Sequence, residues 1–385
     1  MNTATIQALE DQYTSGVYTK RPVAIVRGLG AHLWDADGKE YIDCAGGQGA
    51  ANLGHANPVV AKAIADQAQV LISCPEMFYN DQRALLEEKL VKLTGMGRVF
   101  LCNSGTEAVE SALKFARLLT GRTGVVAAMR GFHGRTMGAL SATWEKKYRE
   151  PFEPLVPGFT HIPYNDQAAL DAAVTDQTGA VILEIVQGEG GVRPGDPAFL
   201  QLAQTLCRER GALLIIDEVQ TGFGRTGKLF AHQHYPLEPD LLCVAKSMAG
   251  GLPMGAALLS ERLGVLPQSV HGSTFGGNPL ACAASLAALG YIEDNHLPER
   301  AAELGEWFKG ALMRIESPLI REVRGMGLMV GIELKQKVTP FLQELMGRGV
   351  MALPAGLTVM RFLPPLVISK EDLATVAETV KAVLE

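Results

Sequence analysis

The chain has 385 residues, of which 47% are hydrophobic and 20% are charged. This length exceeds what a single hydrophobic core usually supports, so we expect two domains, or one large α/β domain with an appendage. The 35 basic and 41 acidic residues give a formal net charge of −6, so the overall charge favours neither nucleic acid nor an anionic membrane as a partner.

The six cysteines lie far apart and form no C-x-x-C pair, so the sequence predicts neither a zinc site nor a redox motif. The first ten residues lack the basic-then-apolar pattern of a secretory leader, and no run of about 18 apolar residues would cross a bilayer. We therefore expect a cytoplasmic protein with reduced cysteines and no bound metal.

Short strands and turns are predicted up to about residue 53, and strand-like runs then alternate with helical patterns from about residue 61 to 255. The strand-like runs are nearly continuous apolar segments: Val99–Cys102, Gly124–Ala128, Ala180–Ile185, Ala212–Ile216 and Leu241–Ala245. Such runs indicate a mostly parallel sheet covered on both faces, which binds its ligands at the carboxyl ends of the strands.

The last hundred residues follow a different pattern. A helix is predicted to begin at Pro279 with Asn278 as its cap, and strands are predicted at 328–334 and 359–363. A final helix is predicted at Ser369, where Ser369 and Asp372 form a capping box. We expect these residues to form a separate, smaller α+β unit.

Polar residues follow the apolar strands at the edge where ligands are expected. Asn103–Glu107 leads into a helix, so its free N–H groups could bind an anion, although an ordinary capped turn is the alternative. Asp217 and Glu218 follow four apolar residues and need partners, because an unpaired buried charge is costly. Asp217 could hold a cationic ring nitrogen, or these carboxylates could simply cap the next turn.

Two further segments reach the same edge. Lys246 ends another apolar strand, and a lysine with a lowered pKa at such a place is a nucleophile for a carbonyl carbon. A lysine that extends to solvent is the alternative. The turn 130–136 offers an aromatic face and a guanidinium in one loop.

Two other patterns are interpreted as structural. The G-x-G-x-x-G match at 222–227 follows the strand only after five intervening residues, and no helical pattern comes after it. This arrangement disfavours a nicotinamide-dependent dehydrogenase. His232 and His234 have no carboxylate or thiol at ligand spacing, so we expect surface histidines there.

Together these segments resemble the class III (subgroup II) aminotransferases, which use pyridoxal 5′-phosphate. The resemblance runs from Gly54-His55 to Arg361–Pro365, and the matching motifs are Ser104–Glu107, Gln187–Gly190, Asp217–Gln220, Ala245-Lys246 and Thr274–Pro279. It implies the type I fold of pyridoxal-phosphate enzymes, an α/β fold. The implied parts are residues 1–55 of the small domain, a large cofactor domain at 56–278, and the C-terminal small domain at 279–385.

The resemblance also implies how the cofactor is held. Lys246 would bind it covalently and carry a proton between substrate and cofactor. Asp217 would pair with the ring nitrogen and keep it protonated, so that the ring can accept electrons. Val219 and Phe132 would lie against the two ring faces. The other contacts would come from Gln220 to the ring hydroxyl and from Gly105, Thr106 and Thr274 to the phosphate.

The implied substrate contacts point to a homodimer and to two amino-group partners. Thr274 would act from the neighbouring subunit, and Ser273 would lie near the substrate. Arg135 would bind the substrate's distal carboxylate. Glu189 and Arg361 would form a switch that hides the positive charge of Arg361 when they are paired and releases it for 2-oxoglutarate. The exchange with glutamate would follow a ping-pong route.

Two subgroups fit, both acting on an amine whose α-amino group is masked. One contains the acetylornithine aminotransferases of arginine synthesis. The other acts on lysine or ornithine joined to a small acidic carrier protein, LysW, in lysine synthesis, and the segments 20–22, 47–55, 144–151 and 324–331 look closer to it. Gln48 stands where enzymes for free ornithine have tyrosine. A possible contact with an acidic carrier would use basic residues, and solvated surface charges are the alternative: Lys20, Arg21, Lys146, Lys147 and Arg149.

Overall fold

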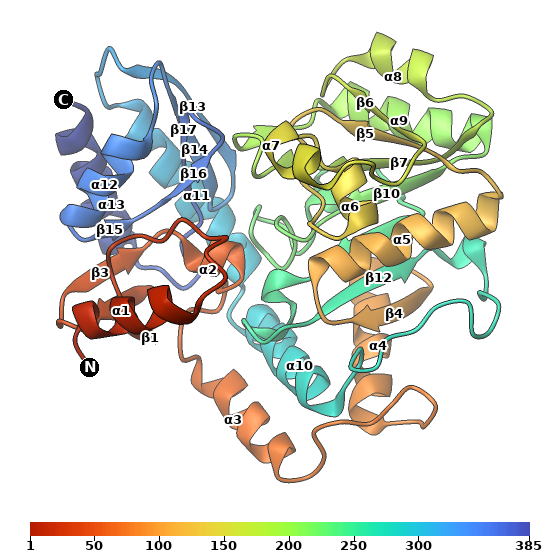
Figure 1. The fold of residues 1–385 in the computed structure, drawn as a ribbon, viewed down its shortest axis with the longest axis horizontal. Coiled ribbons are helices and arrows are strands. Elements are labelled where there is room, and N and C mark those ends of the chain that lie inside the picture. Colours follow the sequence, from red (N-terminus) through yellow and green to blue (C-terminus); the bar gives the residue numbers. More distant parts are fainter.

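A large α/β part and a smaller α+β part lie side by side in the computed structural model, which describes residues 1–385 (Figure 1). The large part is built on a seven-stranded sheet. Its strands in spatial order are β4 (Arg98–Cys102), β12 (Gly255–Leu259), β11 (Leu241–Val244), β10 (Leu213–Asp217), β7 (Thr178–Glu184), β5 (Gly124–Ala128) and β6 (Phe159–Ile162). The predicted α/β class is therefore confirmed.

The sheet is parallel except for β12, which runs antiparallel to both β11 and β4. Alternate residues of the central strands pack on opposite faces. Helix α5 (Gly105–Thr120) covers one face and α9 (Pro197–Arg210) covers the other. The carboxyl ends of β5, β7, β10 and β11 consequently meet at one edge, as expected.

The small part contains two four-stranded sheets made from both ends of the chain. One has the order β1 (Ile25–Leu29), β2 (His32–Asp35), β3 (Glu40–Asp43) and β15 (Val350–Met351). The other has the order β13 (Ile320–Met326), β14 (Met329–Leu334), β17 (Val359–Phe362) and β16 (Leu353–Ala355). The parallel pairing of β15 with β3 joins the two ends of the chain, and both termini lie in this part (Figure 1).

The two predicted helix starts are present. Asn278 Oδ1 accepts the N–H of Ala281 at the start of α10 (Pro279–Asp294). Ser369 Oγ accepts the N–H of Asp372 at the start of α13 (Lys370–Leu384). Each cap satisfies one N–H group that would otherwise have no partner in the first helical turn.

Helix α10 packs against α3 (Pro58–Ala68) and α4 (Asp81–Thr94) of the large part. The division at 55 and 278 remains a prediction, and this packing favours moving the second boundary to the C-terminal side of α10.

The remaining elements are shorter or lie outside the two layers. These helices are α1 (Thr3–Tyr13), α2 (Gly46–Gly49), α6 (Met137–Ala142), α7 (Lys146–Arg149), α8 (Gln167–Ala173), α11 (Leu297–Met313) and α12 (Thr339–Gly347). The 3₁₀ turns are η1 (Glu150–Phe152), η2 (Ala231–His234), η3 (Lys246–Ala249) and η4 (Glu261–Leu263), and a hairpin pairs β8 (Val186–Gln187) with β9 (Arg193–Pro194). No helix has the length and apolar character needed to span a membrane.

Candidate active site

A cavity of about 270 Å³ lies at the carboxyl ends of the central strands. Nine of the predicted site residues line it: Gly105, Thr106, Phe132, Arg135, Glu189, Asp217, Val219, Gln220 and Lys246. The lining also includes three residues for which no role was predicted: His133, Gly134 and Glu184.

One corner of the cavity is the N-terminus of α5. A Cβ on Gly105 would lie 2.6 Å from Val219 Cγ1, so only glycine allows the helix start to approach β10 this closely. A Cβ on Gly134 would lie 2.3 Å from Thr106 Oγ1, and that hydroxyl is 2.7 Å from Thr136 Oγ1. The first N–H groups of a helix have no partner within it, so this corner offers backbone donors, a hydroxyl and a favourable dipole to an anion.

Asp217, at the end of β10, is held in one orientation by two donors. Its Oδ1 accepts the N–H of Val219 at 3.0 Å, and its Oδ2 lies 2.8 Å from His133 Nδ1. Burial lowers the pKa of His133, but the hydrogen bond and charge of Asp217 outweigh burial and leave this pKa above its ordinary value. The protonated form of His133 is thus more favoured than in free histidine, and the contact between Nδ1 and Oδ2 helps to fix the carboxylate.

Glu184 ends β7 and lies beside Asp217 in the sheet register. Its two carboxylate oxygens accept the N–H groups of Phe132 and Gly188, each at 3.0 Å. Burial raises the pKa of Glu184 to about 7, against the lowering effects of His133 and these two N–H groups. Glu184 therefore ties together the loop of Phe132 and the turn that carries Glu189.

Lys246 follows β11 and begins η3 with a φ of 45°, which is unusual for a residue with a side chain. Its Nζ forms no hydrogen bond or ion pair within the chain. Burial lowers its pKa to about 8, with Arg361 acting in the same direction and Glu189 and Asp217 acting against it. An amine with this pKa is partly neutral near pH 8 and is then nucleophilic.

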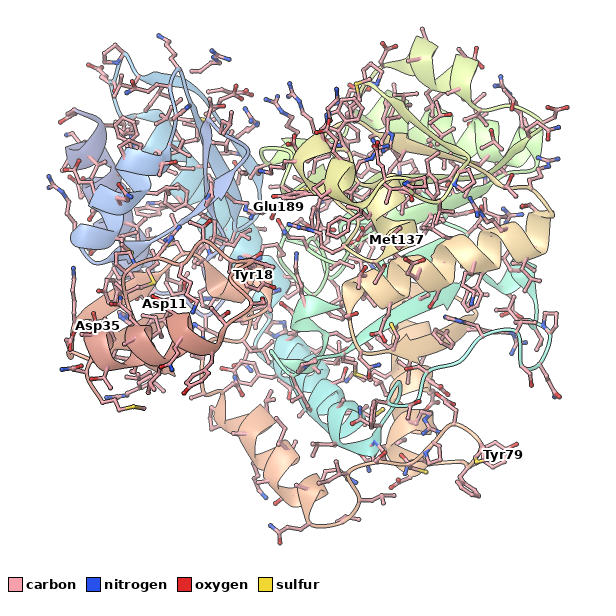
Figure 2. The ribbon with its side chains drawn as sticks, viewed as in Figure 1. Asp11, Tyr18, Asp35, Tyr79, Met137 and Glu189 are labelled. Atoms are coloured by element: carbon pink, nitrogen blue, oxygen red, sulfur yellow. The ribbon has the colours of Figure 1, made fainter.

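The predicted pair of Glu189 and Arg361 is present. Arg361 NH2 lies 2.6 Å from Glu189 Oε1, and NH1 donates to Gln220 Oε1 at 2.9 Å. Arg361 is 1% exposed and comes from β17 of the small part, whereas Glu189 comes from the large part. Figure 2 shows Glu189 at the junction between the two parts. The guanidinium thus reaches two residues of the cavity wall, Glu189 and Gln220, from across the junction.

Arg135 lies over two aromatic rings at the cavity wall. Its guanidinium carbon is 3.6 Å from the ring centroid of Tyr148 and 5.4 Å from that of Phe132. Such stacking orients the guanidinium while leaving its N–H groups available to a carboxylate.

Three predicted residues do not line the cavity of this chain. Arg361 lies behind its wall, in contact with Glu189 and Gln220. Ser273 Oγ accepts hydrogen bonds from Asn103 Nδ2 at 3.1 Å and from the N–H of Gly276 at 3.0 Å. Thr274 is exposed. Its predicted action from a neighbouring subunit remains a prediction.

The structure also shows where the glycine pattern at 222–227 and the two histidines, His232 and His234, lie. No α-helix follows the glycine pattern at 222–227, and its Arg225 is buried and donates to Leu328 O and Asn52 Oδ1. The expectation of surface histidines is wrong for His232, which is buried with Nδ1 2.8 Å from Glu218 Oε1. Glu218 lies near His232 only because the turn folds back after β10, so sequence spacing could not show this pair. His234 is exposed.

The cavity fits the expected cofactor by the chemistry of its donors. The α5 corner suits a phosphate, and Asp217 suits a protonated ring nitrogen. Val219 and Phe132 supply apolar surface for a ring, and Lys246 supplies an amine with no partner in the chain. No group of three or more metal-binding side chains is present in the chain.

Comparisons with known proteins agree with this chemistry. The family model for class III aminotransferases matches residues 13–384. The [LysW]-aminoadipate semialdehyde transaminase of Deinococcus radiodurans is 50% identical, over 98% of this chain and 89% of that protein. The acetylornithine aminotransferase of Methanothermobacter thermautotrophicus is 45% identical, over 97% of this chain and 96% of that protein.

Solved structures show the same fold. The ornithine aminotransferase of Toxoplasma gondii has a TM-score of 0.96 and 36% identity, covering 100% of this chain and 94% of that chain. The acetylornithine aminotransferase of Elizabethkingia anophelis has a TM-score of 0.88 and 33% identity, covering 100% and 99%. Enzymes of this family depend on pyridoxal 5′-phosphate, are typically dimeric, and act on amino acids and keto acids. The chain belongs to the class III aminotransferases and has their type I fold.

Proposed function

We propose that this aminotransferase exchanges the terminal amine of an α-amino-masked lysine or ornithine with 2-oxoglutarate. The mask is the LysW carrier protein and the pathway is lysine biosynthesis; the same exchange on masked ornithine would serve arginine biosynthesis. The [LysW]-aminoadipate semialdehyde transaminase at 50% identity supports this substrate. The alternative is an acetylornithine aminotransferase of arginine biosynthesis, which the relative at 45% identity supports.

The observation that carries the proposal is that Lys246 lines one cavity together with two oriented carboxylates. Asp217 is held by His133, and Glu189 is paired with Arg361. Bound pyridoxal 5′-phosphate supplies an electron-accepting ring that stabilises negative charge on the substrate carbon. The side chains must then hold this ring, move one proton, and accept both the ω-amine and 2-oxoglutarate.

Each side chain has a proposed task. Asp217 keeps the ring nitrogen protonated, and Lys246 binds the cofactor covalently and moves the proton through its Nζ. Val219 and Phe132 lie against the ring, while Gly105 and Thr106 hold the phosphate. Gln220 has its Oε1 occupied by Arg361, so its Nε2 is the group left to reach the ring hydroxyl.

The substrate end of the cavity is proposed to work as a charge switch. When Glu189 neutralises Arg361, the cavity accepts the uncharged chain of an ω-amine. When the pair parts, Arg361 binds the second carboxylate of 2-oxoglutarate through two parallel hydrogen bonds. Arg135, oriented by Tyr148, binds the distal carboxylate of the substrate.

The neighbouring subunit is proposed to complete the site. Thr274 would reach the phosphate of the partner's cofactor, and Ser273 would lie near the partner's substrate. The exposure of Thr274 in the single chain supports this arrangement.

The test is a comparison of amino donors with the holoenzyme and 2-oxoglutarate. We expect Nα-acetyllysine and Nα-acetylornithine to be consumed with formation of glutamate. Free ornithine should have a kcat/KM lower by at least about tenfold, because Gln48 stands where enzymes for free ornithine have tyrosine. Turnover that does not require a 2-oxo acid would identify an aminomutase or racemase of the same fold and overturn the proposal.

A further inference from the structure

The segment between η4 and α10, residues 264–278, contains no helix or strand. Figure 1 shows it on the side of the large part that faces away from the small part. Residues 265–274 form no backbone–backbone hydrogen bond, and Val265 and Phe275 are exposed. The segment nevertheless carries Ser273 and Thr274, which are proposed to serve the neighbouring subunit's site. Side-chain contacts must therefore hold these two residues in place.

His271 makes one of the two hydrogen-bonded attachments that join residues 265–274 to the rest of the chain, and Ser273 makes the other. The Nε2 of His271 lies 3.0 Å from Ser111 Oγ, and its Nδ1 lies 2.9 Å from the Nζ of Lys114. The ring stacks on Phe100 of β4, with 4.9 Å between the ring centroids. The imidazole is thus held by α5 and β4 together.

The directions of these hydrogen bonds define the imidazole of His271 as neutral. An ammonium group can only donate, so Nδ1 accepts from Lys114. Ser111 Oγ donates to Glu107 O at 2.7 Å, so it accepts the N–H of Nε2. Protonation of His271 would place an N–H group opposite the ammonium and break its contact with Lys114. Burial and Lys114 lower the pKa of His271, against the raising effects of Glu110 and Glu107.

The attachment through Ser273 ends close to the same helix. Asn103 Nδ2 donates to Ser273 Oγ and to Glu107 Oε1, both at 3.1 Å. Thr274 follows Ser273 directly and is exposed. The N-terminus of α5 also forms the anion-binding corner of this chain's own cavity. One helix therefore supports its own cofactor site and orients the segment that is proposed to serve the partner's site.

We propose that His271 is a positioning residue, which binds Ser111 and Lys114 so that Thr274 can reach the phosphate of the partner's cofactor. The inference rests on the proposed function, because that function places Thr274 at the partner's site. His271 acts through Thr274 and touches neither cofactor nor substrate. Its attachment reduces the conformational freedom that the segment loses when Thr274 binds the phosphate, and such preorganisation increases affinity.

The affinity for the cofactor tests this role. The holoenzyme is dialysed to equilibrium against decreasing concentrations of pyridoxal 5′-phosphate, and the bound cofactor is measured from its visible absorbance. His271→Phe keeps the aromatic packing and removes both hydrogen bonds, so its Kd should rise by about tenfold. His271→Gln keeps one donor and one acceptor and should lose clearly less affinity.

Two lysine variants separate the attachment from a general loss of surface charge. Lys114→Met removes only the ammonium group of an exposed side chain, and it should raise the Kd for the cofactor by at least about threefold. Lys92→Met is the matched control, because Lys92 is also an exposed helix lysine but pairs with Glu88 and not with the segment. Its Kd should change by less than about 1.5-fold.

A double-mutant cycle shows whether His271 acts through Thr274. Thr274→Ala alone should raise the Kd by at least about tenfold, because a hydrogen bond to a charged phosphate is lost. Adding His271→Phe to Thr274→Ala should then have little further effect, because the segment no longer supplies the contact that His271 positions. A role of His271 in fold stability alone would lower the affinity equally with and without Thr274.

The titration of His271 gives a second signature. The charged groups near its ring are Lys114, Glu107 and Glu110, all on α5, and β4 contributes only the apolar Phe100. Because the pKa of His271 lies below its usual 6.5, the attached neutral form prevails at pH 7.5 and is lost as the pH falls below about 6. Between pH 7.5 and 5.5, the Kd should therefore rise more steeply for the wild type than for His271→Phe, in which the other groups of the site still titrate.

The outcomes are distinguishable. Parallel pH profiles for the wild type and His271→Phe, or a double variant whose loss equals the product of the two single losses, would overturn the positioning role and leave the proposed function intact. A Kd that is unchanged in Thr274→Ala would instead overturn the place proposed for Thr274 in the partner's site, and this inference with it.

Discussion

At the scale of single residues, Lys246 joins a strained backbone to an amine without a partner. A left-handed φ of 45° costs a residue with a side chain roughly 1–2 kcal/mol. The core strand β11 before Lys246 and the buried residues of η3 after it maintain this conformation. The strain places Nζ in the cavity instead of in solvent. The alternative of a lysine that extends to solvent is thus disfavoured by the fold around it.

This position predicts a pH dependence for attachment of the cofactor. Only the neutral amine attacks an aldehyde, and a pKa lowered to about 8 means that half of the lysine is neutral at that pH. When pyridoxal 5′-phosphate is added to the cofactor-free protein, the visible absorbance of the lysine-bound cofactor should appear. The rate of its appearance should rise with pH and reach half its maximum near pH 8. Lys246→Ala should show neither this absorbance nor turnover. A midpoint near 10.5 would contradict the environment described for Lys246.

Arg361 predicts an unequal effect on the two half-reactions. Arg361→Ala should slow the half-reaction with 2-oxoglutarate by at least about tenfold, because a charge-assisted hydrogen bond contributes roughly 1.5–3 kcal/mol, and should slow the half-reaction with the ω-amine less. Single-turnover absorbance measurements follow each half separately. Arg361→Lys, which keeps the charge and loses the fork, should give an intermediate rate. Equal losses in both halves would contradict the switch.

The sequence was informative where a polar residue directly follows an apolar strand, as at Asp217 and Lys246. It was silent where function depends on contacts between loops. His133 lies in the predicted turn 130–136, but its hydrogen bond to Asp217 depends on how the loop after β5 folds over β10. Glu184 carried the same signal as Asp217, an acid at the end of a fully buried strand, and that signal could have revealed it.

At the scale of elements, the β8–β9 hairpin belongs to the large part, but side chains of the small part also bind its turn. Its turn contains Val192, a buried β-branched residue with a φ of 53°. Arg324 on β13 donates to Gly191 O at 2.9 Å through Nε and at 2.6 Å through NH2, and to Val192 O at 3.0 Å. Because Glu189 lies in the same turn, the small part fixes it through Arg324 as well as through Arg361.

The hydrogen bonds from Arg324 to the turn form a clamp. Its removal should lower the stability of the fold and weaken the enzyme's discrimination between substrates. Arg324 is 8% exposed, and Arg324→Ala should lower the free energy of unfolding by about 3 kcal/mol, because it leaves buried carbonyls and part of Glu333 unpaired. The loosened turn should also weaken discrimination between 2-oxoglutarate and the ω-amine.

Arg321→Ala is the matched control for this clamp. Arg321 also pairs with Glu333, but its side chain is 60% exposed, so the loss should be below about 1 kcal/mol. Urea unfolding measures both variants. Similar losses in the two variants would show that Arg324 acts only through Glu333 and not through the turn.

Element types were predictable where composition and length agreed, as in Gly124–Ala128, which is β5 residue for residue. Gly255–Leu259 was not predicted as a strand, because its alanine and leucine residues suit a helix at least as well. It becomes β12 by filling the space between β11 and β4, which is a tertiary constraint. The same applies to α10, whose partners α3 and α4 lie far away in the sequence.

At the scale of the whole molecule, the single chain leaves a broad apolar surface uncovered. Met77, Phe78 and Tyr79, in the segment between α3 and α4, have relative exposures of 80%, 60% and 107%, and Phe275 beside Thr274 has 61%. Figure 2 shows Tyr79 at the outer edge of the molecule, away from the small part. Exposed apolar patches of this kind mark interfaces between proteins, and a second copy of this chain is the occupant that the dimeric family indicates.

A subunit-mixing experiment tests whether Thr274 acts in the partner's site. Thr274→Ala dimers should retain the cofactor poorly, and Lys246→Ala dimers should be inactive. When the two are unfolded together, refolded and supplied with limiting cofactor, each mixed dimer should contain one site with both native residues, because Lys246 and Thr274 of that site come from different chains. Activity should therefore exceed the sum of the separately refolded variants. If Thr274 acted within its own chain, no site in a mixed dimer would carry both residues and mixing would restore nothing.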